Sequence, residues 1–285
     1  NKASSFAPNA KNKLTLYVPL RFWFNRNPGL ALPLIALQYH EVKINIEVEN
    51  ITKVIKTDVA ELTTVKDSGG TDDAGITSCQ LYVDYIYLDT DERRRFAQVS
   101  HEYLIEQVQF TGAESIEANG SNEKFNLNFN HPVKSLHWVI QDDGFLNGSM
   151  VSSVVDGKNS KGGQKLVYHV VTSTDGRNDT FEKGKIMING HDRMPERDSD
   201  YFRLVQNVQH MDVFPRKTIY TYSFALRPSE HQPSGTCNFS RLDNAALHLN
   251  FNTNQKANDR FIKVFAVNYN VLRIMSGMGG LAYSN

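Results

Sequence analysis

Two strand-like runs that lie far apart in the chain resemble each other, and this constrains the fold more than any other feature. The first is CQLYVDYIYL at residues 79–88, and the second is FIKVFAVNYNVLR at residues 261–273. β-Branched and aromatic residues at this density are typical of strands. Weaker matches precede both runs in the same order, residues 15–24 with 218–226 and residues 41–49 with 246–252. The repetition predicts a tandem pair of similar β-sandwiches, which favours a building block over a catalyst.

Side chains alternate between apolar and polar along much of the chain, as they do in a strand that buries one face. Val42, Ile44, Ile46 and Val48 would point one way from residues 41–48, and charged or amide side chains would point the other way. The same period of two recurs in four further runs, which contain Phe125, Leu127 and Phe129; Leu136, Trp138 and Ile140; Tyr220, Tyr222, Phe224 and Leu226; and Leu247, Leu249 and Phe251. This alternation suits antiparallel sheets that share a core about 10 Å thick, so we expect an all-β protein.

Composition and charge argue against several classes of function. The 31 basic residues are balanced by 31 acidic ones, and such a neutral chain does not fit a protein that condenses on nucleic acid. No stretch approaches the roughly 20 apolar residues of a membrane span. Cys79 and Cys237 are too few for a disulfide framework, and their spacing fits no zinc site. We expect two buried thiols and no cofactor.

The acidic and histidine residues do not form a pattern that predicts catalysis. Asp72–Asp73 and Asp142–Asp143 are adjacent pairs in turn-rich loops, where neighbouring side chains diverge instead of facing each other across a pocket. None of the nine histidines lies in a His-Glu-x-x-His motif. The glycine-rich residues 277–280 lack the spacing of a dinucleotide site, and we expect a flexible end or an arm that contacts another subunit. We therefore predict no catalytic, cofactor-binding or metal site.

Five Asn-x-Ser/Thr tripeptides are candidates for N-glycosylation, which also requires the right compartment and enzyme. The asparagines of these tripeptides are Asn50, Asn119, Asn147, Asn178 and Asn238. Asn147 and Asn178 lie in long polar loops and are the best candidates.

A charged tract lies between the two predicted units. It contains three arginines and three acidic residues: Arg93, Arg94, Arg95, Asp89, Asp91 and Glu92. Exposed tracts of mixed charge are usually solvated and contribute little to stability. The alternative is that the arginines bind carboxylates or backbone carbonyls and clamp the two units together.

Prolines and a glycine punctuate an apolar segment of the first unit. Pro28, Gly29 and Pro33 interrupt or border the apolar residues 30–36. Because proline removes ladder donors, we expect an ordered loop or a short turn here and not a strand. The apolar side chains need cover, and a contact between units or subunits is the preferred explanation, with ordinary core burial as the alternative. A short helix is also expected after Asp198 or Ser199.

Four long blocks of the chain, in this order, resemble the major capsid proteins of nucleocytoplasmic large DNA viruses, and those of algal viruses most closely. The blocks are residues 17–42, 85–98, 100–107 and 270–281. The resemblance implies a double jelly roll. Residues 1–99 would be the C-terminal part of a first roll whose opening strands are missing, and residues 100–285 would be a complete second roll of eight strands. The sequence would then be the C-terminal part of a longer chain.

The resemblance also implies a structural, non-enzymatic role. The protein would form homotrimers, pseudo-hexagonal capsomers that tile an icosahedral shell and contact neighbouring capsomers and minor capsid proteins beneath the shell. It would be located in the virion capsid after assembly in the host cell cytoplasm, with no direct contact with nucleic acid and no insertion into a membrane. Two alternatives remain at this point. A β-sandwich glycan hydrolase predicts a cleft with convergent carboxylates, and a carbohydrate-binding module predicts an exposed aromatic platform, for which Tyr220, Tyr222 and Phe224 are the candidates.

Overall fold

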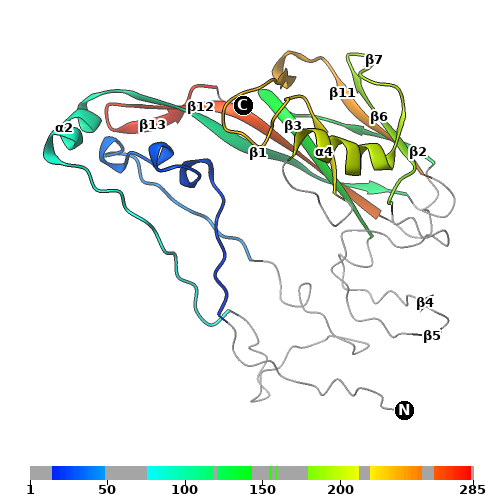
Figure 1. Ribbon diagram of the computed structural model, residues 1–285, viewed down its shortest axis with the longest axis horizontal. Coiled ribbons are helices and arrows are strands. Elements are labelled where there is room, and N and C mark those ends of the chain that lie inside the picture. The colour runs from blue at the N-terminus through cyan, green and yellow to red at the C-terminus, as the bar shows by residue number, and fades with distance from the viewer. Residues whose placement is uncertain are drawn as a thin grey trace, which may run out of the picture.

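A computed structural model describes residues 15–48, 76–117, 121–142, 154–155, 158–159, 179–211, 219–251 and 260–283. Figure 1 shows two packed sheets built from the part of the chain after residue 100, while the N-terminal segments run away from the sheets as extended chain. No helix among the described residues is long and apolar enough to span a bilayer.

The first sheet is antiparallel and is centred on two long strands. Its strands, in hydrogen-bonded order, are β1 (His101–Ile116), β12 (Arg260–Met275), β3 (Pro132–Asp142) and β10 (Cys237–Asn238), with β9 (Tyr220–Ser223) also beside β3 and β13 (Met278–Leu281) also beside β12. The β1–β12 ladder runs from the pair His101↔Ile274 to the pair Ile116↔Arg260. Because both strands are 16 residues long, their ribbon extends beyond the end of β3.

The second sheet faces the first and is also antiparallel. It contains β2 (Asn122–Asn126), β11 (Ala245–Asn250), β6 (Lys183–Ile188) and β7 (His191–Asp192) in that order, with β8 (Arg197–Asp198) also beside β6. A separate small ladder joins β4 (Val154–Val155) to β5 (Lys158–Asn159). The chain crosses from one sheet to the other between β1 and β2 and between β2 and β3. It crosses again between β10 and β11 and between β11 and β12. Two antiparallel sheets exchanged in this way form a jelly roll, so the prediction of an all-β jelly-roll fold is confirmed.

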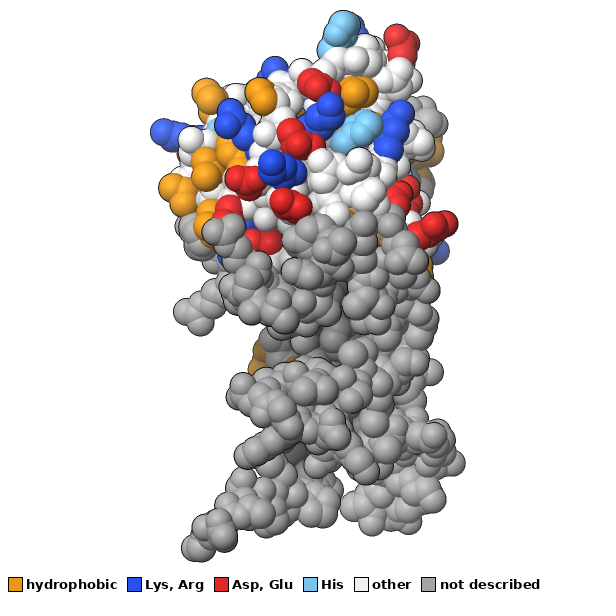
Figure 2. Space-filling model, turned by 90° about the vertical axis from the view of Figure 1, so that its right-hand side faces the viewer, with side chains coloured by type: hydrophobic (Ala, Val, Ile, Leu, Met, Phe, Trp, Pro, Cys, Tyr) orange, Lys and Arg blue, Asp and Glu red, His pale blue; other side chains and the backbone are white. Residues whose placement is uncertain are grey.

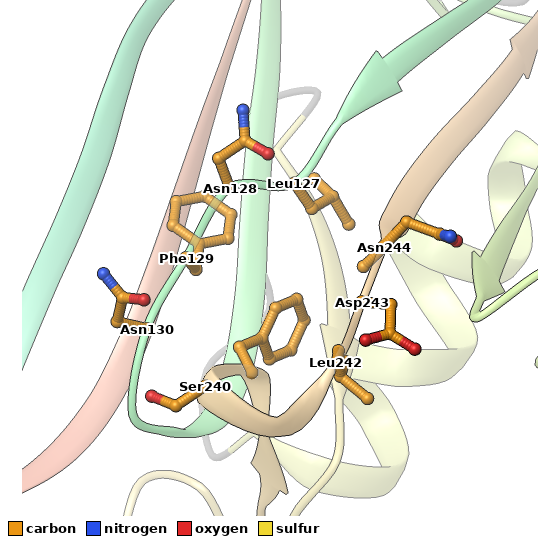
Figure 3. Close-up of a pocket in the computed structure, with 10 residues that line it drawn as sticks. Leu127, Asn128, Phe129, Asn130, Ser240, Leu242, Asp243 and Asn244 are labelled. Atoms are coloured by element: carbon orange, nitrogen blue, oxygen red, sulfur yellow. The ribbon is translucent and has the colours of Figure 1, made fainter.

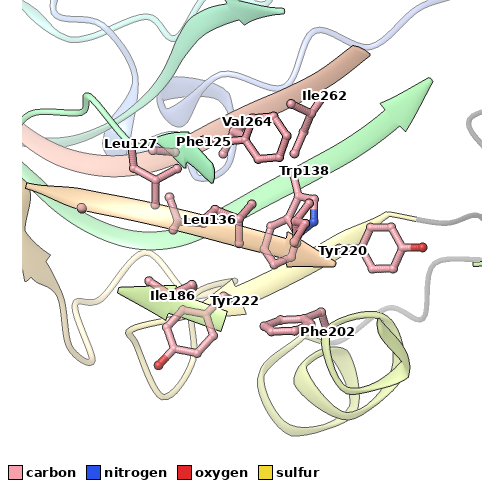
Figure 4. Packing of buried hydrophobic residues seen from close by; sticks show 14 of the residues in the cluster. Phe125, Leu127, Leu136, Trp138, Ile186, Phe202, Tyr220, Tyr222, Ile262 and Val264 are labelled. Carbon is pink, nitrogen blue, oxygen red and sulfur yellow. The ribbon is translucent and has the colours of Figure 1, made fainter. Parts of the chain in front are cut away.

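The core between the sheets is aromatic. Trp138 is fully buried and packs edge-on against Phe202 at 5.2 Å and stacked on Tyr220 at 6.0 Å between ring centroids (Figure 4). The alternating residues predicted for the second unit are largely confirmed as core: Phe125, Leu127, Phe129, Leu136, Ile140, Tyr222, Leu247, Leu249 and Phe251 are also buried. Burial of a large apolar side chain stabilises a fold by about 1.5–3 kcal/mol. Only the end of the run from Tyr220 to Leu226 departs from the pattern, because Leu226 lies beyond β9 and is exposed.

Short helical segments cover the ends of the sheets. The helix expected after residue 199 is present as a π-helical turn, η4 (Tyr201–Val205), followed by α4 (Gln206–His210). The segment with Pro28 and Pro33 forms the 3₁₀ turns η2 (Pro28–Leu30) and η3 (Leu34–Ala36), as predicted. A further 3₁₀ turn that was not predicted, η1 (Trp23–Asn25), precedes it. The charged tract forms a helix that was not predicted, α2 (Thr90–Gln98).

The strands predicted for the first unit are not formed. Residues 15–22, 41–48 and 79–88 are extended but pair with no strand among the described residues, and their side chains are mostly exposed. The physical reason is that a strand is stable only when a neighbour satisfies its backbone hydrogen bonds and covers one of its faces. Cys79 lies in one of these runs and is exposed, and Cys237 is half-buried, so the expectation of two buried thiols is wrong.

Candidate inter-unit interface

Residues 272–281 form a hairpin and not the flexible end that was one of the two expectations for the glycine-rich segment. Strand β13 folds back on β12 through Ser276 and Gly277, with Met275 and Met278 as the closing pair. Both turn residues have a positive φ, 53° and 82°. Two positive φ values in a two-residue loop are the mark of a type I′ turn, whose twist matches that of the strands it joins. The hairpin therefore presents a fixed surface at the end of the β1–β12 ribbon.

The first unit docks on this hairpin through residues 34–39. Ala36 and Leu37 are buried against Ile274, with Tyr103 and Leu272 packed around them. The backbone N–H of Tyr39 donates to the carbonyl oxygen of Gly277 at 2.9 Å. A Cβ atom at Gly277 would collide with the Tyr39 ring, and one at Gly279 would lie 3.1 Å from a methyl group of Leu37. The apolar residues near Pro33 are thus covered by the second unit, which is the inter-unit contact that the sequence favoured.

A buried ionic cluster lies beside the apolar contact. Lys134 Nζ donates to Glu106 Oε1 at 2.6 Å, and both side chains are almost fully buried, at 3% and 6% exposure. Arg26 from the first unit binds the other oxygen of Glu106 at 2.9 Å. His231 Nδ1 lies 3.8 Å from Glu106, and the Lys134 ammonium lies over the Tyr269 ring. Burial lowers the pKa of Lys134 below its usual value, although the hydrogen bond and charge of Glu106 act in the opposite direction.

The three arginines, for which a clamp between the units was the alternative to a solvated tract, lie on helix α2. Asp89 caps α2, its side chain accepting from the backbone N–H of Glu92 at 2.9 Å. All three arginines are exposed, and the ion pair that the structure gives them is Arg94–Asp91 within the helix, at 4.0 Å. Among the described residues, the ion pair that bridges the units is made by Arg26. Arg26 lies between Asn25 and Asn27, and no pattern around it marks it as a residue of an interface.

The structure describes one of the five candidate glycosylation sites. Asn238 caps the turn η5 (Phe239–Arg241), and its side chain accepts from the backbone N–H of Ser240 at 3.1 Å. Phe239 is buried, and the Ser240 hydroxyl accepts from the backbone N–H of His131 at 2.8 Å. This tripeptide is therefore fixed in the folded protein. Asn50, Asn119, Asn147 and Asn178 lie outside the described residues.

The clearest hollow in the described part of the protein lies between the β2–β3 turn and the β10–β11 connection (Figure 3). Its volume is about 290 Å³, and its polar lining includes Asn128, Asn130, Ser240, Asp243 and Asn244. Hydrolysis of a glycoside uses two carboxyl groups, and this hollow has one, that of Asp243. Asp72, Asp73 and Asp143 lie outside the described residues. The hollow thus gives the hydrolase alternative no support.

The two candidate residues for an aromatic platform that lie in β9 are core residues. Tyr220 is fully buried and Tyr222 is nearly so, while Phe224 is half-buried against the same core. The Tyr220 hydroxyl donates to Asp179 and accepts from the backbone N–H of Thr180, and burial raises its pKa well above the usual value. These side chains cannot stack on a sugar, so the carbohydrate-binding alternative lacks its platform.

Two family models match consecutive parts of the chain, and the boundary between them lies at the start of α2. Residues 92–280, which contain the whole jelly roll described above, match the family "large eukaryotic DNA virus major capsid protein". The chain belongs to this family. Residues 4–89 match a second model of these capsid proteins, "major capsid protein N-terminus".

Individual capsid proteins of algal viruses are similar over nearly the whole chain. The chain is 47% identical to the major capsid protein of Pyramimonas orientalis virus over 99% of its own length, and 41% identical to that of Paramecium bursaria Chlorella virus 1 over 94%. It spans just under two thirds of these relatives, 65% and 66% of their lengths. The crystal structure of PBCV-1 VP54, fitted into a reconstruction of the virophage Sputnik, matches with a TM-score of 0.70 at 36% identity, covering 94% of this chain and 70% of that one. The Faustovirus major capsid protein, at 12% identity, shares the fold, with a TM-score of 0.50 over 66% of this chain and 36% of that one.

Proposed function

We propose that this capsid protein self-assembles into trimers, pseudo-hexagonal capsomers that tile an icosahedral virus shell. The observation that carries the proposal is the match of the capsid family over the whole jelly roll, residues 92–280. Its function would be structural and non-enzymatic. A rigid sandwich suits the wall of a shell, because its shape is set by a close-packed core that resists deformation.

The surface of the chain supports self-association. Large apolar side chains are exposed on both units, among them Tyr17, Tyr82, Ile86, Val208 and Leu226. The formal net charge is zero, and Figure 2 shows acidic and basic side chains interspersed on the described part of one face. Copies of a neutral chain do not repel one another, and exposed apolar patches gain stability when a partner covers them. Many modest contacts of this kind, repeated by symmetry, would hold a shell together.

We also propose the division of the chain into two units, residues 1–99 and residues 100–285, with α2 at the boundary. The positions of the two family matches, residues 4–89 and 92–280, support this division. In an assembled capsomer, the exposed arginines of α2 would bind acidic or carbonyl groups and clamp the units, with Asp89, Asp91 and Glu92 in the same cluster. Replacement of Arg93, Arg94 and Arg95 by Ala should then lower the stability of the trimer, and an unchanged stability would rule out the clamp.

The remaining partners follow from the role of a shell protein. Neighbouring capsomers would contact the sides of the trimer, and minor capsid proteins would bind beneath the shell. Assembly would take place in the host cell cytoplasm and the product would be the virion capsid. None of these contacts requires direct binding of nucleic acid or insertion into a membrane.

The test is the mass of the protein in solution. Light scattering or sedimentation should give three times the 32.3 kDa of one chain. An obligate trimer interface should bury more than about 2,000 Å². A mass of 32.3 kDa that persists at high protein concentration would contradict the proposal.

A further inference from the structure

Three side chains that can carry a positive charge stand side by side on the outer face of the second sheet. In the register of β2, β11 and β6, His248 pairs directly with Lys124 on one side and with Lys185 on the other. Leu247 and Leu249 point into the core, so His248 between them and its two cross-strand partners point outward. Neighbouring strands lie about 4.8 Å apart, so the two lysines are separated by about 10 Å with the imidazole between them. We call these three residues the cationic ladder.

Folding alone does not account for the cationic ladder, because like charges directly opposite each other destabilise a sheet. Lys185 has an acidic partner, since its Nζ lies 2.9 Å from Asp192 Oδ2. Lys124 is exposed and has no ion pair among the described residues. Figure 2 shows histidine side chains among lysine, arginine and acidic ones on the side of the molecule where β6, β7 and β11 lie in Figure 1. One positive charge of the ladder is thus left without a counter-charge in the described part of the chain.

His248 adds a hydrogen-bonding group that the fold does not use. Its side chain is half-buried, and its Nε2 atom is buried without a hydrogen-bond partner among the described residues. Burial, and then the charges of the two lysines, lower the pKa of His248, while Asp192 from β7 acts in the opposite direction. Glu196, which lies just before β8, accepts a hydrogen bond from Asn250, the next outward residue of β11. Protonation of the imidazole is therefore disfavoured until another anion balances the lysines.

We propose that the cationic ladder is a binding site for an oxyanion, either a carboxylate of another molecule or a free ion such as sulfate or phosphate. An oxyanion has several acceptor oxygens, so it can accept hydrogen bonds from both ammonium groups and from a protonated His248 at once. The lysine side chains are long and flexible, and they can close over an anion that sits on the imidazole. Binding brings a proton onto His248, because the anion offsets the lysine charges that disfavour the imidazolium. The site does not depend on the number of chains in a capsomer.

NMR titration of the His248 imidazole in the whole chain tests the proposal, with sodium sulfate as the probe. Sulfate stays fully ionised over the pH range in which histidine titrates. We expect sulfate to raise the pKa of His248 by about one pH unit above its value in sodium chloride of equal ionic strength. Chloride is the reference because screening of the lysine charges also raises this pKa. Equal pKa values in the two salts would overturn the proposal.

Three lysine variants separate a built site from a general effect of charge. Without sulfate, Lys124→Gln and Lys185→Gln should each raise the pKa of the imidazole, since each removes a charge that disfavours its protonation. The same two variants should lose most of the further rise that sulfate causes. Lys183→Gln is the control and should change neither value, because Lys183 lies on the same face of β6 but pairs across the strands with Asn250 and Asp198. If Lys183→Gln reduced the response to sulfate as much as Lys124→Gln does, the ladder would not be a specific site.

A second titration distinguishes the two sources of the oxyanion. A triglutamate peptide replaces sulfate, and the pKa of His248 is followed in the same way. Saturation at a lower concentration of peptide than of sulfate would assign the ladder to the carboxylates of another molecule, and the reverse order would assign it to a free ion. No response to either probe would refute the proposal. The solution mass is measured separately, so a trimer whose His248 ignores both probes would contradict this inference alone.

Discussion

Replacement of Gly277 by Ala should uncouple the first unit from the C-terminal hairpin. The backbone at Gly277 has φ 82°, a conformation that costs a residue with a Cβ about 1–2 kcal/mol. The added Cβ would also collide with the Tyr39 ring, and relieving such overpacking typically costs about 1–3 kcal/mol. We therefore expect a total loss of about 2–5 kcal/mol, together with faster hydrogen exchange at the Tyr39 amide, whose hydrogen bond goes to the Gly277 carbonyl.

Two other glycines separate backbone strain from collision. Gly190 has φ 79° in the Asn189–Gly190 turn, but a Cβ there would have no atom within 4 Å, so Gly190→Ala measures strain alone. Gly280 lies in β13 without a positive φ and with open space around it, so Gly280→Ala should change stability by less than about 0.5 kcal/mol. Urea denaturation of the three variants gives the comparison. If Gly277→Ala costs no more than Gly190→Ala, the Tyr39 ring does not pack tightly on the turn and the argument fails.

Three further predictions follow from charged and polar groups. Burial, and secondarily the charge of Lys134, lowers the pKa of His137 to about 4 from its usual 6.5. Because the unfolded chain then binds the proton more readily than the folded chain, the free energy of unfolding should be highest above pH 6.5 and should fall by up to about 3 kcal/mol as the pH drops to 4. His137→Gln should remove this pH dependence in urea titrations. Glu106→Gln leaves the Lys134 ammonium buried without its carboxylate and should lower the free energy of unfolding by about 3–5 kcal/mol. Glu102→Gln on the same strand is the control, because its partner Arg273 is exposed, and it should lower the same free energy by less than about 1 kcal/mol. Asn238 should carry no glycan in virion protein, because its half-buried side chain caps the turn η5 beside the buried Phe239; intact-mass and peptide mapping that found a sugar there would refute this.

The second unit could be predicted in detail because its signals are local and consistent. The alternation at Leu136, Trp138 and Ile140 has a period that only a strand can use to bury one face, and the structure buries all three. Helix α2 could also have been found. Asp89 followed three residues later by Glu92 is a helix-start pattern, and the structure shows the Asp89 cap. The run of three arginines directed attention to charge and away from this signal.

The first unit shows where sequence patterns stop being sufficient. The alternation at Val42, Ile44, Ile46 and Val48 is as regular as any in the second unit, yet these residues form no ladder among the described residues. A strand pattern states which face would be buried, but it does not supply the neighbour that buries it. Pairing is a long-range property, and the closing of long loops must be offset by contacts that form only when the whole sheet is present.

The sequence indicated the apolar part of the inter-unit interface but not its ionic part, and the two parts have different roles. Leu37 and Ala36 on Ile274 provide non-directional apolar burial, which stabilises the contact but tolerates small rotations of one unit against the other. The cluster of Arg26, Glu106 and Lys134 gains little net stability, because two of its side chains had to leave water. The cluster does fix the orientation of the first unit on the second. Lys134 binds one carboxylate oxygen of Glu106 and Arg26 binds the other, so the first unit must place Arg26 at that second oxygen. In the proposed shell, any error in the angle between the units would be repeated at every copy, and a contact that is directional without being strong would limit that error.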